Sequence, residues 1–309
     1  MRKLAVLAIS AALVMGTMTG CGSTNSDAKN SDNAGTNKSA SSETGFDTSK
    51  DISVVSREDG SGTRGAFIEL TGVEEKDADG NKVDNTTLDA SITNSTEVMM
   101  TTVSGNDYAI GYASLGSLND TVKAVKVGGV EATADNINAG TYTLARPFNI
   151  VTGDSVSEVA QDFIDFVLSA DGQKIVEDNK YTASVDNAKA FKTKAPTGKL
   201  VIAGSSSVSP VMEALKEAYL AVNTNAEIEI QTSDSTTGVN SAKEGICDIG
   251  MASRELKDEE KSAGLTATVI AIDGIAVIVN DSNPIETMTK DQVKSVYVGE
   301  TTDWSQLNG

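Results

Sequence analysis

Histidine is absent from this chain of 309 residues, and proline, tryptophan and cysteine are scarce. The absence of histidine excludes histidine-ligated metal sites, Ser-His-Asp triads and histidine general bases. No Gly-Lys-Ser/Thr follows a glycine-rich turn, so the sequence also lacks a Walker-type phosphate loop. We therefore expect no enzymatic activity, no catalytic residue, no metal and no cofactor.

Basic residues are also few. The chain has 25 Lys and Arg against 44 Asp and Glu, which gives a net charge of −19. This balance argues against nucleic acid and anionic membrane surfaces as partners. An acidic protein can still bind an anion locally, if backbone N–H groups at helix N-termini form the site. The length allows one large domain or two medium lobes.

The chain has only two cysteines, Cys21 and Cys247. A disulfide between them is formally possible, but Cys21 has a separate explanation. It ends the segment MTGC (18–21), which follows the basic residues Arg2 and Lys3 and an apolar run too short to span a bilayer. We expect Cys247 to be a buried small hydrophobe.

The segment that ends at Cys21 resembles the lipobox of bacterial lipoproteins, with Met18 in place of the usual Leu. The resemblance implies that residues 1–21 are a lipoprotein signal peptide and that Cys21 carries the lipid, palmitate included. The protein would then be anchored to the extracytoplasmic face of the cell membrane. An ordinary secretory signal is the alternative. Residues 22–49 are polar and predict a disordered tether with a reach of about 30 Å.

From residue 51 onward, apolar runs and amphipathic segments alternate, which predicts an α/β architecture. The expected strands are 52–56, 109–115, 122–127, 200–203 and 227–231. The expected helices are 64–70, a pair within 155–179 that breaks at Asp171-Gly172, 211–222, 239–244 and 289–298. Residues 77–84 indicate a polar turn.

One apolar stretch, residues 268–280, is too long for an ordinary buried strand. Gly274 interrupts it, which indicates a bend or a crossing between two lobes. We expect the partner crossing at residues 144–150, where Pro147 interrupts the run.

The segment SREDGSGTR (56–64) lies between an expected strand and an expected helix. Its glycines allow close approach of a ligand to the backbone, and the helix N-terminus offers free N–H groups. Ser61 and Thr63 add hydroxyl donors, Arg57 can bind an oxyanion with two parallel hydrogen bonds, and Asp59 could hold Arg57. An N-capped turn without a ligand is the alternative.

The same segment also contains G-x-G-x-x-G at positions 60, 62 and 65, the pattern of dinucleotide-binding loops. A polar turn stands where that family requires a strand ending in an acid, which argues against a dinucleotide.

Two further loops, GSSSVSP (204–210) and TSDSTTG (232–238), are rich in hydroxyl groups and precede expected helices. Either loop alone could be ordinary helix capping. Together with SREDGSGTR they would converge at the carboxyl ends of strands, where open α/β sheets bind ligands. A fourth segment, DIGMASREL (248–256), is ambiguous as chemistry.

These motifs, with AIGYASLGSL (109–118), FIDFVLSADGQKIV (163–176) and AIDGIAVIVN (271–280), resemble the phosphate-binding proteins of ABC importers, the PstS family. The resemblance extends over nearly all of residues 51–309. It implies a two-lobe periplasmic-binding-protein fold of type II and a solute-binding protein that delivers inorganic phosphate to ABC permease membrane subunits. A binder of another tetrahedral oxyanion, or a phosphate-sensing or adhesion module, is the alternative.

The order of the motifs differs from the family's order. In the family the GSSSVSP-like loop comes first, and the region around Trp304 leads directly into the strand before SREDGSGTR. The resemblance therefore implies circular permutation, which close termini make tolerable, or a fragment of a tandem array. We expect one lobe to combine residues 50–146 with 280–309 and the other to contain residues 147–279, with the ligand in the cleft between them.

The resemblance also implies a set of phosphate-binding positions, with Asp59 orienting the arginine. They are Arg57, Ser61, Gly62, Thr63, Ser206, Ser207, Ser235 and Ser253. Ser253, followed by Arg254, stands where many members carry an Asp that accepts the proton of hydrogen phosphate and so helps to reject sulfate. Asp234 is a possible substitute acceptor.

Overall fold

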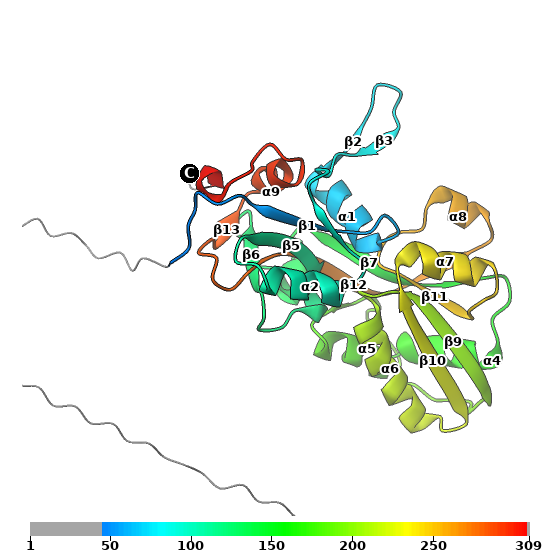
Figure 1. The fold of residues 1–309 in the computed structure, drawn as a ribbon. Helices are drawn as coiled ribbons and strands as arrows, with labels where there is room; N and C mark the ends of the chain where they lie inside the picture. The colour runs from blue at the N-terminus through cyan, green and yellow to red at the C-terminus, as the bar shows by residue number, and fades with distance from the viewer. Residues whose placement is uncertain (1–44, 308–309) are drawn as a thin grey trace, which may run out of the picture. The chain divides into compact units, whose positions relative to one another are not determined.

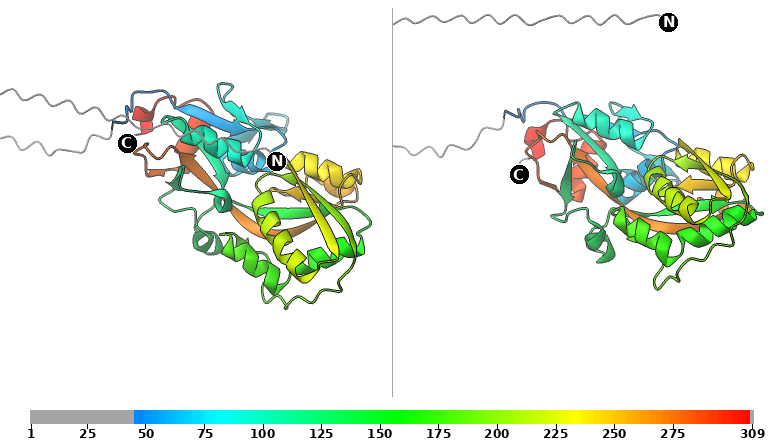
Figure 2. Two further views of the ribbon diagram at one scale, coloured as in Figure 1. Left: turned by 60° about the horizontal axis from the view of Figure 1, so that its bottom comes forward. Right: turned by 90° about the horizontal axis from the view of Figure 1, so that it is seen from below.

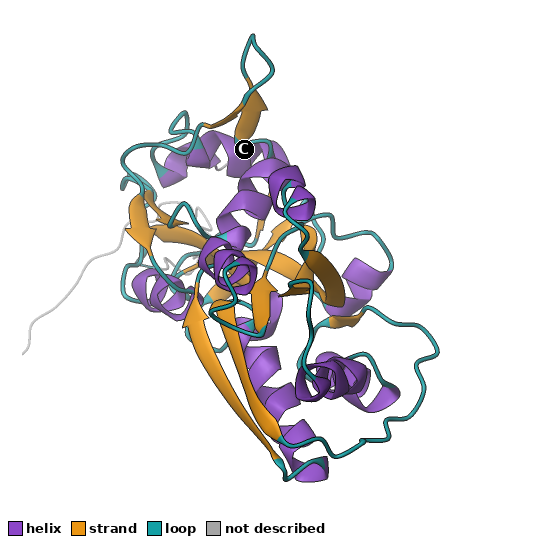
Figure 3. Cartoon of the chain, turned by 90° about the vertical axis from the view of Figure 1, so that its right-hand side faces the viewer, coloured by secondary structure: helices purple, strands orange, loops and turns teal. Residues whose placement is uncertain are grey.

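The structure is a computed structural model that describes residues 45–307. The predicted signal peptide, Cys21 and nearly all of the predicted tether lie outside the described residues. Within them, one sheet of eleven strands and a separate two-stranded hairpin are flanked by helices (Figures 1 and 3). The main path through the large sheet runs β10-β9-β11-β7-β12-β5-β1-β4.

The strands of the described chain are β1 (Ser53–Arg57), β2 (Glu74–Lys76), β3 (Lys82–Asp84), β4 (Ser91–Thr93), β5 (Ala109–Ser114), β6 (Lys123–Val127), β7 (Ala145–Thr152), β8 (Thr182–Ala183), β9 (Gly198–Ser205), β10 (Ala226–Ser233), β11 (Ile249–Ala252), β12 (Thr266–Val279) and β13 (Thr287–Met288). The α-helices are α1 (Gly62–Thr71), α2 (Thr96–Ser104), α3 (Ala134–Asn138), α4 (Glu158–Val167), α5 (Ala170–Asp178), α6 (Ser209–Val222), α7 (Ser235–Lys243), α8 (Asp258–Ser262) and α9 (Lys290–Tyr297). Short 3₁₀ turns lie at Leu115–Ser117 and Trp304–Leu307.

One hydrophobic core gathers around β1, β5 and the second half of β12, with α1, α2 and α9 packed on it. Aromatic side chains form its centre. The ring of Phe67 stacks on Tyr112 with centroids 4.0 Å apart and meets Tyr297 edge-on at 4.7 Å. Such pairs add about 0.5–1.5 kcal/mol each beyond the area that they bury. This core supports the end of β1 from which the SREDGSGTR loop emerges.

The other part of the sheet, around β9, β10 and β11, is covered on both faces. Leu200 and Ile202 belong to a core shared with α4, α5 and α6, whereas their neighbours Val201 and Ala203 pack with residues of α7. Side chains alternate between the faces of a strand, so a nearly continuous apolar run predicts burial on both sides. The three strands are parallel, and their carboxyl ends therefore point the same way.

Strands β7 and β12 lie between these cores, side by side in Figures 1 and 2. β12 is a single strand of 14 residues, longer than an ordinary buried strand, and the predicted interruption at Gly274 is wrong. Gly274 does not interrupt it. The first half of β12 pairs with β7 up to Gly274, and the second half pairs with β5 and β6 from Ile275 onward. This change of partner keeps a long strand hydrogen-bonded throughout.

Other predicted elements are present, with shifted ends. The break between α4 and α5 lies at Leu168 and Ser169 rather than at Asp171-Gly172, because the Ser169 hydroxyl caps α5. The polar segment 77–84 is the turn and second strand of a hairpin, β2–β3, that projects from the rest of the fold (Figure 1). Cys247 is buried, as predicted, and burial raises its pKa to about 11.

The first and last described segments lie together. The N–H of Ile52 donates to the carbonyl of Thr302 at 2.7 Å, and the N–H of Trp304 donates to the carbonyl of Lys50 at 3.3 Å. In residues 45–307, no helix is long and apolar enough to cross a membrane.

Candidate functional site: a hydroxyl cluster at four helix N-termini

Four helices begin at one place in the fold, each after a strand. α1 begins after β1, α2 after β4, α6 after β9 and α7 after β10. Side chains of Ser61, Ser95 and Asp234 cap α1, α2 and α7 by accepting backbone N–H groups. Each helix N-terminus carries a partial positive charge and unpaired N–H groups, so their convergence favours an anion.

Seven hydroxyl side chains from these helix starts and neighbouring loops form a buried hydroxyl cluster. Its members are Thr63, Thr96, Ser205, Ser206, Ser207, Ser235 and Ser253. Thr63 Oγ1 lies 2.8 Å from Ser207 Oγ and 3.4 Å from Ser253 Oγ. Ser235 Oγ lies 3.2 Å from Ser253 Oγ and accepts the Ser253 N–H at 3.0 Å. The cluster thus joins residues that are up to 190 positions apart in the sequence.

Arg57 ends β1 beside this cluster, and only 2 % of its surface is exposed. Its guanidinium donates to Ser206 Oγ at 3.1 Å and to Thr96 Oγ1 at 3.3 Å. Its backbone N–H donates to the Tyr112 hydroxyl at 3.0 Å. Burial raises the pKa of Tyr112 to about 12, so this support is a neutral phenol. The arginine therefore lies at a fixed position with its donors facing the hydroxyl groups.

The carboxylate that holds Arg57 is Glu58 and not Asp59, which corrects the prediction. Both carboxylate oxygens of Glu58 accept from Arg57, each at 2.8 Å. The side chain of Asp59 is almost fully exposed and pairs with Arg64 at 2.8 Å. Glu58 points towards Arg57, whereas Asp59 points into solvent beside Arg64.

The remaining predicted positions also lie here. Ser61 is buried and caps α1, where its Oγ accepts the Arg64 N–H at 3.3 Å. Gly62 follows, and a Cβ placed on it would lie 2.4 Å from Ser235 Oγ. Asp234, the possible substitute acceptor, caps α7 instead and packs against Gly60.

Three contributors were missed in the sequence analysis. Thr96 bonds to Ser207 Oγ at 2.9 Å, and Ser205 donates to Ser253 Oγ at 3.0 Å. Arg146, at the start of β7, donates to Thr63 Oγ1 at 3.0 Å. Thr96 could have been found from the adjacent hydroxyl residues Ser95 and Thr96, which are typical of a helix start. Nothing in the sequence indicated a role for Arg146 beyond its position within residues 144–150, the predicted crossing between lobes.

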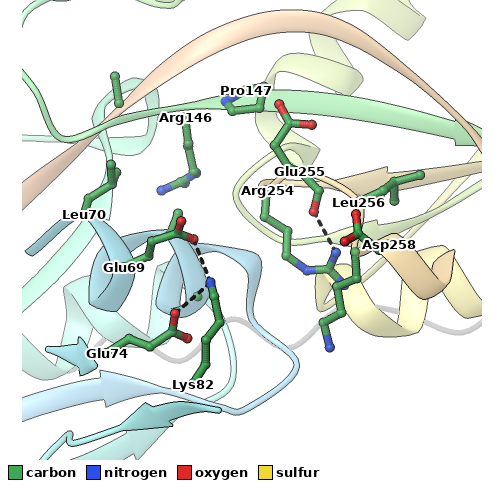
Figure 4. A pocket seen from close by; sticks show the side chains of 14 residues that line it. Glu69, Leu70, Glu74, Lys82, Arg146, Pro147, Arg254, Glu255, Leu256 and Asp258 are labelled. Carbon is green, nitrogen blue, oxygen red and sulfur yellow. Dashed lines mark hydrogen bonds and ion pairs between the residues drawn. The ribbon is translucent and has the colours of Figure 1, made fainter. Parts of the chain in front are cut away.

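A pocket of about 590 Å³ lies beside the cluster, between α1, the β2–β3 hairpin, the start of β7 and the loop Arg254–Asp258 (Figure 4). Lys82 at its rim pairs with Glu74 at 2.8 Å, and Arg254 pairs with Glu260 at 2.8 Å. Arg146 lines this pocket as well as contacting Thr63. Among residues 45–307, no group of three or more His, Cys, Asp or Glu is arranged to hold a metal ion.

The arrangement suits binding of a small anion rather than bond-making chemistry. Hydroxyl groups, helix N-termini and guanidinium groups supply many donors, and the two sides of the site come from different cores. In the described chain, no carboxylate is hydrogen-bonded to the hydroxyl cluster, although carboxylates hold both arginines. The positive character of the site therefore comes from the four helix N-termini and acts locally, within a protein of net charge −19.

Comparison with known proteins agrees with this geometry. A family model described as a PBP superfamily domain matches residues 31–171 and 190–309. The chain is 51 % identical over 308 residues to phosphate-binding protein PstS 2 of Streptococcus agalactiae serotype V. This match covers 99 % of this chain and 98 % of that protein. It is 46 % identical over 256 residues to PstS 2 of Streptococcus pneumoniae serotype 4, covering 83 % and 87 %.

A solved structure of a phosphate-binding protein of a phosphate ABC transporter from Streptococcus pneumoniae TIGR4 superposes with a TM-score of 0.67. The two are 45 % identical, and the match covers 84 % of this chain and all of that chain. A shorter match, 32 % identical over 126 residues, links the chain to the PstS protein of Bacillus subtilis strain 168, covering 40 % of this chain and 41 % of that protein.

Proposed function

Because this chain belongs to the PstS family of phosphate-binding proteins within the PBP superfamily, we propose that it captures inorganic phosphate for an ABC importer. It acts as a binding protein and not as an enzyme. Its partners are phosphate and the membrane subunits of a permease.

The observation that carries this proposal is the convergence of four helix N-termini, the hydroxyl cluster and Arg57 on one buried place. A tetrahedral oxyanion accepts hydrogen bonds in all directions, and such a site supplies donors from all sides. The two sides are joined by hydrogen bonds such as Thr63 to Ser207, so the ligand is held in the cleft between two lobes. Opening and closing of that cleft would control entry and release.

Selectivity for phosphate over sulfate depends on an acceptor for the proton that hydrogen phosphate carries and sulfate lacks. Ser253 is the candidate, since its Oγ already takes part in three hydrogen bonds with other hydroxyl groups. A hydroxyl can accept as well as donate, but it rejects a bare dianion less strongly than a carboxylate does.

Calorimetric titration of the purified chain with phosphate, with sulfate as competitor, tests the proposal. We expect micromolar or tighter phosphate affinity that Arg57→Ala weakens at least about 10-fold, because hydrogen bonds to charged groups contribute about 1.5–3 kcal/mol. Arg57→Lys keeps the positive charge but loses the pair of parallel donors, so its phosphate affinity should lie between those of the wild-type chain and Arg57→Ala. Absence of phosphate binding by the wild-type chain would overturn the proposed function.

The lipid anchor is a separate part of the proposal. The sequence MTGC supports lipidation of Cys21 and retention at the extracytoplasmic face of the cell membrane. Cys21→Ala should move the protein from the detergent phase to the aqueous phase in a detergent partition of the producing cells. Unchanged partitioning would argue for an ordinary secretory signal.

We also propose that the fold is a circular permutation. The contacts of Lys50 and Ile52 with Trp304 and Thr302 support it, since a short connection there would restore the family's order. The match over 98 % of the streptococcal relative but only 41 % of the Bacillus protein is what two different orders would give. The lobes would then be residues 50–146 with 280–309, and residues 147–279.

A further inference from the structure

Arg146 is a cation that the predicted site does not include. It is 3 % exposed and lies opposite Asp273 in the antiparallel pairing of β7 with β12. Its Nη2 is 3.0 Å from Asp273 Oδ2 and donates to Thr63 Oγ1, also at 3.0 Å. The side chain therefore connects the two long strands to the hydroxyl cluster, and Figure 4 shows it pointing from β7 towards α1.

Two donors of this guanidinium remain unused. Neither Nε nor Nη1 of Arg146 has a hydrogen-bond partner among the residues that the structure describes, although both atoms are buried. Leaving buried donors of a charged group unpaired is costly. Asp273 Oδ2 beside them also lacks a hydrogen-bond partner in the described chain, so the two Arg146 donors are available to a ligand. Lys82 and Arg254, which line the same pocket, are paired with glutamates as Arg146 is paired with Asp273, but Arg146 differs from them in having buried donors without a partner.

The groups around Arg146 fix it without neutralising the whole site. Its guanidinium carbon lies 5.3 Å from the centre of the Phe148 ring, and Asp273 is held by the Ser114 hydroxyl at 2.9 Å. Arg57, Tyr112 and Tyr181 are the other titratable groups close to it. Across the pocket lie further titratable groups, namely Glu69, Glu74, Lys82, Arg254, Glu255, Lys257 and Asp258. Burial raises the pKa of both tyrosines, so they stay neutral.

We propose that Arg146 is a second anion-binding arginine, and that with Arg57 it makes the site bind phosphate as the dianion in preference to the monoanion. This inference rests on the proposed function and specifies the form of the ligand. Glu58 and Asp273 balance the formal charges of the two arginines. The preference therefore comes from hydrogen bonding, because guanidinium groups can only donate and so favour unprotonated phosphate oxygen atoms. In the described chain, no carboxylate bonded to the hydroxyl cluster favours a protonated phosphate oxygen.

The first test is the phosphate Kd measured on both sides of the pH at which free phosphate loses its second proton. Arg146→Gln should raise the Kd at the alkaline end by about 10- to 100-fold. Arg146→Lys keeps the positive charge, so its Kd for phosphate should rise less than that of Arg146→Gln. The matched control is Lys82→Gln, a cation that lines the same pocket and pairs with Glu74 but has a largely exposed side chain, and its Kd should stay within about twofold of wild type.

The second test begins with the wild-type chain alone. The phosphorus NMR shift of bound phosphate reports its charge, and in the wild-type chain it should remain that of the dianion at pH values where free phosphate is mostly monoanionic. In Arg146→Gln, the pH at which bound phosphate becomes the monoanion should move towards the pH at which free phosphate does so. An ion pair with a purely structural role would not shift this titration.

The outcomes separate the two proposals. If Arg57→Ala weakens binding but Arg146→Gln matches wild type in Kd and pH profile, the inference about Arg146 is wrong and the phosphate-binding function stands. Bound phosphate that is monoanionic in the wild-type chain would also overturn the inference. If the wild-type chain does not bind phosphate at all, the proposed function fails, and this inference fails with it.

Discussion

Individual residues in this protein are constrained by how closely the loops approach each other, and Gly62 is the clearest case. Any Cβ there would lie 2.4 Å from Ser235 Oγ and 2.8 Å from Ser253 Oγ. Ser235 is fully buried and its Oγ accepts the Ser253 N–H, so it cannot rotate away without losing that bond. We expect Gly62→Ala to weaken phosphate binding at least tenfold, about 1.4 kcal/mol, in a calorimetric titration.

Gly65 provides the matched control for that substitution. It lies in the same helix, α1, but a Cβ there would meet nothing within 4 Å. Gly65→Ala should leave phosphate affinity unchanged and stabilise the fold by about 0.5–1 kcal/mol, because alanine loses less conformational entropy in a helix. Equal affinities for the two variants would contradict the close approach of the loops.

Asp273 predicts a specific pH dependence of stability. Burial raises its carboxyl pKa to about 6, against the opposing effect of Arg146, whereas an unfolded chain has about 3.9. The folded state therefore holds this proton more tightly, and the stability that the group contributes is present below about pH 4 and lost as pH rises through about 6.

The comparison variant is Asp273→Asn, which cannot titrate. Urea unfolding at a series of pH values should show the wild-type free energy of unfolding falling relative to that of the variant between about pH 4 and pH 7. Other carboxylates titrate in both proteins and cancel in the difference. A difference that stays constant over this range would show that Asp273 is not perturbed in the folded state.

Where a local motif marks a position, the sequence indicated residues that the structure brings together, and their part in phosphate binding stays a prediction. Ser207, Ser235 and Thr63 stand at strand-to-helix junctions, where hydroxyl side chains have a reason to be. Arg146 could not be found in this way, because its role depends on its register opposite Asp273, 127 positions away by number. The choice between Glu58 and Asp59 likewise depends on the direction of the chain after β1.

At the scale of elements, a buried side chain of α4 contributes three hydrogen bonds that hold the segment between β8 and β9 against α4 and α6. Asp162 is buried and accepts from Thr193 Oγ1 at 2.7 Å, the Lys194 N–H at 3.0 Å and the Tyr219 hydroxyl at 2.9 Å. We expect Asp162→Ala to lower the free energy of unfolding by about 2–4 kcal/mol, because several buried donors lose their acceptor.

The control for this prediction lies one turn along the same helix. Asp165 is exposed and accepts only from Gln161, so Asp165→Ala should change stability by no more than about 0.5 kcal/mol. Urea unfolding measures both variants. Similar losses for the two would show that Asp162 does not secure the segment.

Most strands and helices followed from local pattern, because apolar periodicity reports which face is buried. The full length of β12 could not be predicted in this way. Its first half pairs with β7 and its second half with β5 and β6, and this change of partner depends on the tertiary structure. Helix α2 and the short strand β4 were also missed, because the polar and hydroxyl residues in this region resemble a loop. Strand β11 lies within DIGMASREL, a segment that the sequence analysis left ambiguous.

For the whole molecule, the structure explains how an acidic protein can hold an anion. The charge of −19 is spread over the chain, whereas Arg57, Arg146 and four helix N-termini face one buried cluster of hydroxyl groups. Strands β7 and β12 pass between the two cores that supply the opposite sides of this cluster. Binding at this place therefore depends on both cores at once.

A crystal structure of the chain with phosphate tests this account most directly. It should show the phosphate among the hydroxyl groups of Thr63, Ser207 and Ser253, with oxygen atoms accepting from the Arg57 guanidinium. Phosphate bound instead at the outer pocket beside Lys82 and Arg254, or a hydroxyl cluster that excludes it at saturating phosphate, would contradict the central claim.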